Sequence, residues 1–437
     1  MMKNIFQIFK QFLFAIVLLI LVIPVIQTKF TLIKVLPLKG AITSENNSHF
    51  TVKSWLSGDY QKQKEVYLNE SFGFRNIFVR LNNQIAFTLF NKAKANGVII
   101  GKKNYLYEQN YINAYYGRDF NGEDSIISKI VKLKFIQDTL AKLNKNLIII
   151  LAPGKGTFFP EYFPDELKST PRKSNYQYYA ELTHTYSLNC IDFNKYFVEN
   201  KAKSKYPLFP QHGIHWSDYG SAIAADSIIR YIENLRGISM PHLYWNDIEI
   251  ADSRESDNDI EEGMNLLFKL KQQKMAYPKL LFESDSLKTK PSALVIADSF
   301  FWQIYGRGIT TLFSKCHFWF CGRQIYPESF EKSLTSDQID LKSEIEKHDI
   351  IIIMATEANL RNFGWEFIDK ASDKFVGVPI IHNAAFNLKV SETITNIRND
   401  KKWHELIQQK ALERGISLDS MMLLDAIWTV EMNMNKK

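Results

Sequence analysis

The chain has 437 residues, 46% of them hydrophobic and 23% charged, enough for a substantial core in one large or two ordinary domains. Its 54 Lys and Arg residues are spread among 47 Asp and Glu, and the formal net charge is only +7. This mixture excludes the clustered basic stripe that nucleic-acid-binding proteins use. The three cysteines (Cys190, Cys316 and Cys321) form no C-x-x-C pair, so we expect buried free thiols rather than a structural zinc site.

The N-terminus carries an uninterrupted apolar run, Phe12 to Ile26, preceded by Lys3 and Lys10. Apolar residues on both sides lengthen the run toward the roughly 20 residues that cross a bilayer. No small-x-small cleavage signal follows it, so we predict an uncleaved anchor over residues 1–35. Because no other segment is long and apolar enough to span, we expect a single-pass protein of the inner (cytoplasmic) membrane. The rest of the chain is then expected on the extracytoplasmic, periplasmic side.

Residues 36–95 are predicted to form a juxtamembrane, largely helical segment. After a Ser-Gly break at Gly58, apolar residues recur at the helical positions Phe78, Leu81, Ile85 and Leu89.

Residues 96–385 alternate between helical patterns and short apolar runs. Residues 97–101 form a short apolar run before a turn. The runs 146–151, 293–297, 349–354 and 376–382 are typical of strands buried on both faces, and residues 125–145 repeat apolar positions on one helical face. This alternation predicts an α/β domain with a mainly parallel sheet covered on both sides. In such sheets ligands gather beyond the carboxyl ends of the strands. Residues 386–437 are expected to form a C-terminal helical extension of two or three short helices, with a break at Gly415.

The segment "LVIADSFFWQIYG" places Ser299 where a predicted strand ends and a helix begins. A serine at this edge is a candidate nucleophile, and backbone N–H groups beyond it can bind a developing oxyanion. Taken alone, the segment favours a serine that merely caps the helix, because strand-Ser-helix turns are common.

The segment "PQHGIHWSDYG" places His215 directly before a strong helical pattern, with Ser217 as the expected N-cap. A histidine in such a loop can act as general base to a serine. Two alternatives are a metal site that uses His212 with His215, for which no third ligand is evident nearby, and a histidine hydrogen-bonded in a packed loop.

Several motifs occur together and in order: "WLSGDY…LNESFGFRN", "GVIIGKKNYLY", "LAPGKGTFFPEYFP", "GIHWSDYG" and "VIADSF". Over roughly residues 54–385 they resemble the SGNH-hydrolase-like domain of the alginate O-acetyltransferase group. The resemblance implies a three-layer SGNH-like fold and an anchored or exported protein that places acetyl groups on exopolysaccharide, with a membrane O-acyltransferase partner. It also implies a Ser-His-Asp triad in which Ser299 is the nucleophile and His215 the base.

The chain departs from that pattern because the family's aspartate falls on Gly213. The aspartate holds the imidazole in orientation and stabilises the imidazolium, and its loss can cost up to ~10⁴ in rate. Asp218, three residues after the histidine, is the first candidate to replace it. Asp192 and a backbone carbonyl are the others, and an inactive relative is a further alternative.

Other predicted site residues lie at further strand ends and beside the histidine. Gly154 could donate an oxyanion N–H, and Lys155 and Glu357 match family positions; a turn or surface role is the alternative for each. Asn359 could supply an amide donor, while Trp216 and Tyr219 could stack on a sugar or belong to the core.

An acidic run between Glu255 and Glu262 could bind calcium but lacks EF-hand spacing, so a solvated acidic loop is the favoured interpretation. We expect neither a metal nor a cofactor.

Together these features predict a membrane-anchored acyltransferase that O-acetylates a cell-surface polysaccharide. The alternatives are a carbohydrate esterase with the same site, and a non-catalytic polysaccharide-binding or scaffold protein.

Overall fold

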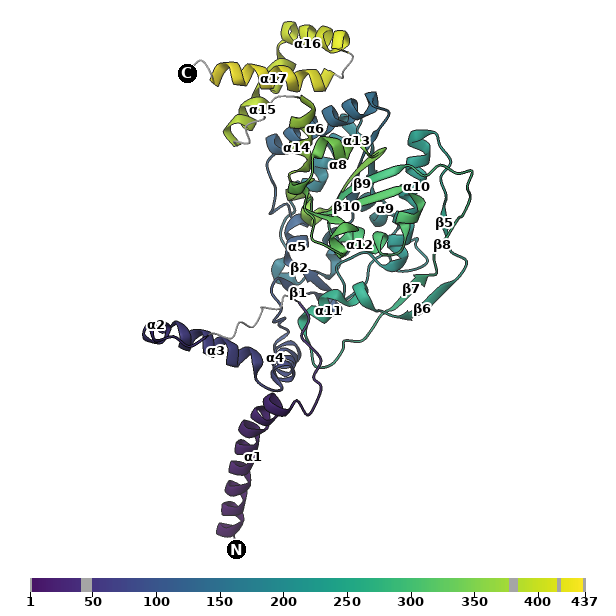
Figure 1. Cartoon of the computed structure of the whole chain (residues 1–437). Coiled ribbons are helices and arrows are strands. Elements are labelled where there is room, and N and C mark those ends of the chain that lie inside the picture. The colour runs from purple at the N-terminus through teal and green to yellow at the C-terminus, as the bar shows by residue number, and fades with distance from the viewer. Residues whose placement is uncertain (1, 41–48, 377–383, 415–417, 435–437) are drawn as a thin grey trace. The chain divides into compact units, whose positions relative to one another are not determined.

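The computed structural model describes residues 2–40, 49–376, 384–414 and 418–434 (Figure 1). The chain divides into two compact units. The first comprises Met1–Ile100 with Asn258–Gln272, and the second comprises Gly101–Asp257 with Gln273–Lys437.

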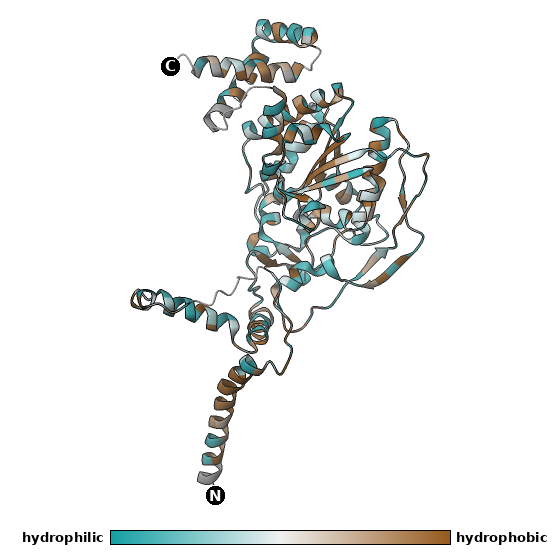
Figure 2. Ribbon diagram, in the orientation of Figure 1, coloured by the Kyte–Doolittle hydropathy of each residue, from teal (hydrophilic) through white to brown (hydrophobic). Residues whose placement is uncertain are grey.

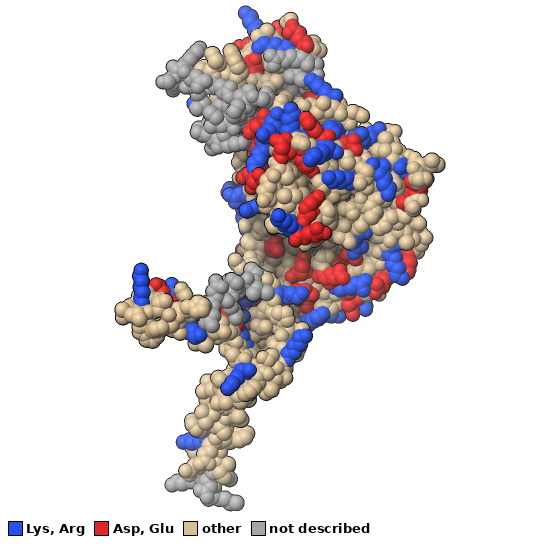
Figure 3. Space-filling model, in the orientation of Figure 1, with Lys and Arg blue, Asp and Glu red and all other residues tan. Residues whose placement is uncertain are grey.

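The first unit begins with the long helix α1 (Met2–Phe30). Within it, Phe6–Phe30 is 25 residues long with a mean hydropathy of 2.6, longer than the roughly 20 residues that a bilayer requires. Figure 2 shows the apolar character of this helix, and Figure 3 shows few charged side chains on it. The predicted N-terminal apolar helix is confirmed, and by length and composition it could cross a membrane.

The predicted helical segment after the anchor is also present. It consists of α2 (Val52–Leu56), α3 (Asp59–Ser71) and α4 (Arg75–Phe90). Gly58 separates α2 from α3 with a φ of 83°, a left-handed conformation that favours glycine. Asn83 of α4 donates a hydrogen bond of 2.9 Å to the carbonyl of Met264, at the end of α11 (Asp259–Met264).

The second unit is built on a six-stranded sheet of order β11-β10-β9-β12-β3-β4. All neighbouring strands are parallel except β11, which pairs antiparallel with β10 at the edge. The predicted mainly parallel sheet is therefore confirmed. The strands are β3 (Asn146–Ala152), β4 (Cys190–Asp192), β9 (Ser292–Ala297), β10 (Lys315–Phe320), β11 (Gln324–Tyr326) and β12 (Ile350–Thr356).

Helices cover both faces of this sheet and give the predicted three layers (Figure 1). Alternate residues of the central strands, such as Ile149, Ile296 and Ile353, join one large apolar core with the helices of one face. Those helices are α6 (Glu123–Lys142), α8 (Asn175–Thr185), α13 (Leu341–Glu346) and α14 (Phe367–Val376). The other face carries α9 (Phe193–Asn200), α10 (Asp218–Arg236) and α12 (Phe300–Tyr305).

The predicted C-terminal helices are α15 (Ala384–Asn399), α16 (Lys401–Arg414) and α17 (Leu418–Met434). They are not a detached extension, because Ile394 of α15 and Met422 of α17 join the apolar core that α6 lines. The strand predicted over 376–382 has no counterpart at Val376, which ends α14. Its other residues lie outside the described part of the chain.

A peripheral hairpin positions the start of the acidic run. Strands β6 (Ile248–Asp252) and β7 (Lys274–Pro278) pair antiparallel, and residues 253–257 continue from the end of β6. The remaining short strands and α-helices are β1 (Val98–Ile100), β2 (Leu106–Glu108), α5 (Gln109–Tyr115), α7 (Lys155–Phe158), β5 (Leu243–Tyr244) and β8 (Leu281–Phe282). All three cysteines are free thiols; Cys316 is buried as predicted, whereas Cys190 and Cys321 are only half-buried.

Candidate active site

Ser299 lies immediately beyond the carboxyl end of β9, at the first turn of α12. Although it occupies the N-cap position, its side chain makes no capping hydrogen bond. Its Oγ instead lies 2.9 Å from Nε2 of His215. The alternative of a serine that only caps the helix is therefore wrong, and the geometry is that of a nucleophile beside a base.

His215 is held in the loop that leads into α10. Ser217 caps this helix as predicted, since its Oγ accepts from the Gly220 N–H at 2.9 Å. The imidazole packs against the ring of Phe300, with 4.8 Å between centroids. Gln303 of α12 donates to the Trp216 carbonyl at 3.0 Å, which ties the histidine loop to the helix that follows the serine.

Asp298 fixes the turn that presents Ser299. Its Oδ2 accepts hydrogen bonds from the Thr356 N–H at 2.8 Å, the Thr356 hydroxyl at 2.7 Å and the Asn359 amide at 2.8 Å. Its Oδ1 accepts from the Phe300 N–H at 3.2 Å. Neither Asp298 nor Thr356 was predicted as a site residue, although Asp298 stands directly before the serine in the motif.

Asn359 was predicted as an amide donor to the substrate. Its Nδ2 donates to Asp298 Oδ2 and, at 3.1 Å, to Thr356 Oγ1. These two acceptors lie 2.7 Å apart, so the amide nitrogen approaches both from one side. The structure gives Asn359 a role in positioning Asp298, and its role as an amide donor to the substrate stays a prediction.

The two carboxylates predicted to replace the missing aspartate are engaged by other groups. Asp218 forms an ion pair with Arg307. Asp192 caps α9 by accepting from the Lys195 N–H at 2.9 Å and accepts the Tyr176 hydroxyl at 3.0 Å. His215 is not among these partners of either carboxylate.

Lys155 is completely buried, so the prediction that it contacts substrate or an oxyanion is wrong for this structure. Its ammonium group donates to the carbonyls of Gln211 at 2.8 Å and Gly213 at 2.5 Å. The lysine therefore holds the histidine loop from beneath. The neighbouring Gly154 directs its N–H at Asn194 Oδ1, 3.3 Å away, and this bond competes with its predicted oxyanion role.

Glu357 lies behind the site. The Thr157 hydroxyl donates to its carboxylate, at 2.7 Å from both oxygens, and burial raises the pKa of Glu357 to about 7. A side-chain carbon at Gly154 would lie 2.2 Å from Glu357 Oε2, so a glycine is needed where these two segments meet. This contact makes Glu357 a packing partner of the Gly154 turn.

The two aromatic residues predicted to stack on a sugar differ in accessibility. Trp216 is fully buried and packs edge-on against Phe300, with 5.4 Å between ring centroids, so its predicted sugar contact is wrong. Tyr219 is half-buried, beside Tyr206 and Trp245, and stays a candidate.

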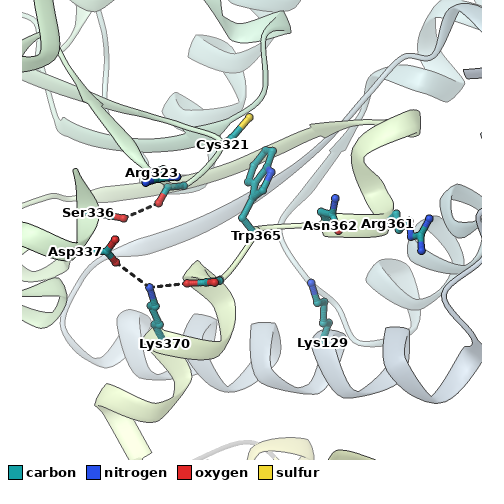
Figure 4. Close-up of a pocket in the computed structure, with 11 residues that line it drawn as sticks. Lys129, Cys321, Arg323, Ser336, Asp337, Arg361, Asn362, Trp365 and Lys370 are labelled. Carbon is teal, nitrogen blue, oxygen red and sulfur yellow. Dashed lines mark hydrogen bonds and ion pairs between the residues drawn. The ribbon is translucent and has the colours of Figure 1, made fainter. Parts of the chain in front are cut away.

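A cavity of about 430 Å³ opens at the carboxyl edge of the same sheet (Figure 4). Cys321 lines it and donates its N–H to the carbonyl of Ala297 at 2.8 Å, two residues before Ser299. The Trp365 indole and the side chains of Arg323 and Arg361 line it as well, whereas Lys370 is paired with Asp337 and Glu366. The cavity thus offers an aromatic ring and cationic groups at this edge of the sheet, and neither Ser299 nor His215 is among its lining residues.

Among the residues that the structure describes, one group has the composition of a metal site: His317, Glu344 and His348, with possible ligand atoms within 4.8 Å of one another. His317 Nδ1 is already 2.6 Å from Glu344 Oε1, and its Nε2 is 3.1 Å from Glu328. The arrangement is that of a histidine held between two carboxylates. It includes neither His212 nor His215, the pair considered from the sequence.

Comparisons with known proteins agree with this fold. Residues 98–243 match the family described as the SGNH hydrolase-like domain of acetyltransferase AlgX, a range that includes His215 and ends before Ser299. A probable alginate O-acetylase AlgJ of Pseudomonas syringae pv. tomato is 23% identical over 44% of this chain and 49% of its own length. One from Azotobacter vinelandii is 21% identical over 41% and 44%, so the chain spans about half the length of the curated relatives it matches.

Among solved structures, the O-acetyltransferase domain of Pseudomonas putida AlgJ aligns at 13% identity and a TM-score of 0.42 over 64% of this chain and 99% of that one. Bacillus cereus PatB1 with a sulfonyl adduct aligns at 12% identity and 0.43, over 62% and 99%. Over residues 98–243, the predicted resemblance to the SGNH-hydrolase-like domain of the alginate O-acetyltransferase group is confirmed.

Proposed function

We propose that this protein is a membrane-anchored O-acetyltransferase that acetylates a cell-surface polysaccharide through Ser299 and His215. The observation that carries the proposal is the 2.9 Å separation between Ser299 Oγ and His215 Nε2 at the carboxyl edge of the sheet. The family match and the names of the curated relatives support acetyl transfer as the reaction.

In the proposed reaction, Ser299 Oγ attacks the carbonyl carbon of an acetyl ester while His215 Nε2 accepts the hydroxyl proton. Collapse of the tetrahedral intermediate forms the acetyl-serine, and the departing alcohol takes the proton from His215. A sugar hydroxyl then loses its proton to His215 and attacks the acetyl-serine. The products are an O-acetylated sugar and the regenerated Ser299 hydroxyl, with the backbone N–H of Ser299 as the expected oxyanion donor.

The cavity lined by Trp365, Arg323 and Arg361 is the proposed acceptor site. An indole ring provides a flat apolar face for a sugar ring, and guanidinium groups bind hydroxyl or carboxylate oxygens. The Cys321–Ala297 hydrogen bond connects the wall of this cavity to the end of β9, two residues before Ser299, and an extended acceptor is proposed to reach from the cavity to Ser299. Tyr219 is a second proposed sugar contact.

The location and partner follow from the N-terminal helix and from the resemblance. Phe6–Phe30 is proposed to anchor the protein in the inner membrane, with the second unit on the periplasmic side. A membrane-bound O-acyltransferase is proposed to supply the acetyl group, because an extracytoplasmic enzyme needs a donor delivered across the membrane.

Mass spectrometry of the full chain in detergent, after exposure to p-nitrophenyl acetate, tests the proposal. We expect a single acetyl group on Ser299, absent from Ser299→Ala and strongly reduced in His215→Ala. Added oligosaccharides should then accept the group; release to water alone would favour the carbohydrate esterase. A Ser299 that stays unmodified in the wild type, with polysaccharide binding unaffected by Ser299→Ala, would refute the proposal in favour of a binding protein.

A further inference from the structure

Gly213 stands two residues before His215, at the position where the resembled family has its aspartate. A side-chain carbon built at Gly213 would lie 2.3 Å from the Ser256 carbonyl oxygen and 2.8 Å from the Asp257 carbonyl carbon. Real side-chain carbons do not approach this closely, so the position must be glycine. The backbone of Ser256 and Asp257 therefore occupies the space that an aspartate at 213 would need.

The side chain of Asp257 is buried with only 1% of the residue exposed, unlike a solvated acidic loop. The Tyr277 hydroxyl donates to Asp257 Oδ2 at 2.7 Å and in turn accepts the Arg254 N–H at 2.9 Å. A carboxylate removed from water is costly unless donors or cations face it. Tyr277 thus holds one carboxylate oxygen in a fixed orientation, within a loop that lies against the histidine loop.

Gln303 connects three segments of the candidate site: the helix that follows Ser299, the loop of His215 and the loop of Asp257. Its amide donates to the Trp216 carbonyl at 3.0 Å and to the Ser256 hydroxyl at 2.6 Å. It stands on α12, the helix that follows Ser299. The residue after His215 and the residue before Asp257 are therefore fastened to the same side chain.

We propose that Asp257 is the positioning residue for His215, replacing the aspartate that Gly213 excludes. Resting on the proposed function, this assigns Asp257 to accept the Nδ1–H of His215. It thereby leaves Nε2 free to take the Ser299 proton and stabilises the imidazolium that forms. Asp218 and Asp192, the other nearby carboxylates considered, are engaged by Arg307 and by the α9 N-terminus.

The test compares Asp257→Asn with Glu262→Gln, a matched loss of one carboxylate in the same acidic run. Glu262 is exposed, with 43% of its side chain accessible, and pairs with Lys39. In the full chain, Asp257→Asn should slow Ser299 acetylation by about 10²- to 10⁴-fold, while Glu262→Gln should leave it unchanged. Wild-type rates for Asp257→Asn would overturn the proposal and favour a backbone carbonyl as the orienting group.

A readout independent of catalysis separates this inference from the proposed function. The pKa of His215, measured by NMR of histidine-labelled protein, should fall in Asp257→Asn because a nearby negative charge is lost. An unchanged pKa would overturn the role of Asp257 even if the wild type acetylates Ser299. If the wild type fails to acetylate Ser299, the pKa measurement still decides the role of Asp257.

Tyr277→Phe provides a second variant should Asp257→Asn fold poorly. It removes the hydroxyl that holds Asp257 Oδ2 but keeps the carboxylate. We expect a smaller loss, about 3- to 10-fold in acetylation rate, and a shift of the pH–rate profile, because Asp257 loses its fixed orientation. A rate and profile identical to the wild type would contradict the proposed arrangement.

Discussion

Replacing Gly213 with alanine tests the packing on which the site depends. The added carbon would lie 2.3 Å from Ser256 O and 2.9 Å from Asp257 O, whereas nonbonded atoms prefer about 3.5 Å or more. Because the opposing atoms are backbone, the loop must shift by about 1 Å. Overpacking of this kind costs about 1–3 kcal/mol of folding free energy. The shift would also displace Asp257, so Ser299 acetylation should fall together with stability.

Equilibrium unfolding in urea, with acetylation of Ser299 measured in parallel, checks this expectation. Gly263→Ala is the control, because no atom lies within 4 Å of its added carbon and the residue sits in the helix α11. That substitution should be neutral or stabilise by up to about 1 kcal/mol. A Gly213→Ala protein that unfolds at the wild-type urea midpoint and keeps the wild-type rate would refute the reasoning. Gly213→Asp should lower the acetylation rate as well, since its side chain meets the same clash.

Burial raises the pKa of Glu357 from 4.5 to about 7, so the folded state keeps a proton that the unfolded chain releases. This difference in pKa contributes roughly 3 kcal/mol to the free energy of unfolding, fully present below pH 4.5 and lost as pH rises through 7. Glu357→Gln should abolish this dependence of the unfolding free energy on pH, as urea unfolding at several pH values would show. Asp298→Asn should slow acetylation and destabilise by about 1–3 kcal/mol, because an amide nitrogen would face the Thr356 donors; thermal unfolding and acetyl labelling measure both effects. Trp365→Ala should raise the KM for an oligosaccharide acceptor and leave acetylation of Ser299 by a small ester unchanged, as steady-state kinetics would show. Deleting residues 2–30 should move the protein from the membrane to the soluble fraction, as centrifugation would show.

The central sheet could be predicted from sequence because its strands are long β-branched runs. The run 146–151 became β3 and the run 349–354 became β12 with small shifts at the ends, since strands buried on both faces need continuous apolar residues. The short edge strands β4 and β11 carry too few residues for such a signal. The C-terminal helices were expected, but their share in the main core was not, because helical periodicity does not specify the partner.

Ser299 and His215 could be found because each stands at the junction of a strand or loop with a helix. Such positions lie at the ligand edge of a parallel sheet, which limits the search to a few residues. Trp216 and Lys155 were misjudged for a related reason. Their types suit a sugar or an anion, but tertiary packing buries both completely. Sequence position alone does not distinguish a residue that faces the substrate from a buried residue that supports the histidine loop.

The acidic run shows most clearly what the sequence left undetermined. Its carboxylates alternate without a periodicity that distinguishes one from another, and a solvated loop was the reasonable expectation. The pairing of β6 with β7 brings Asp257 to Tyr277 and buries it, while Glu262 remains exposed. A glycine at 213 then acquires a specific meaning. Judged from the sequence alone, it is a lost catalytic aspartate and an argument for inactivity; in the structure it is the residue that lets the Asp257 loop approach. The missing aspartate and the close loop are therefore one structural feature, and under the proposed role of Asp257 the glycine supports activity instead of arguing against it.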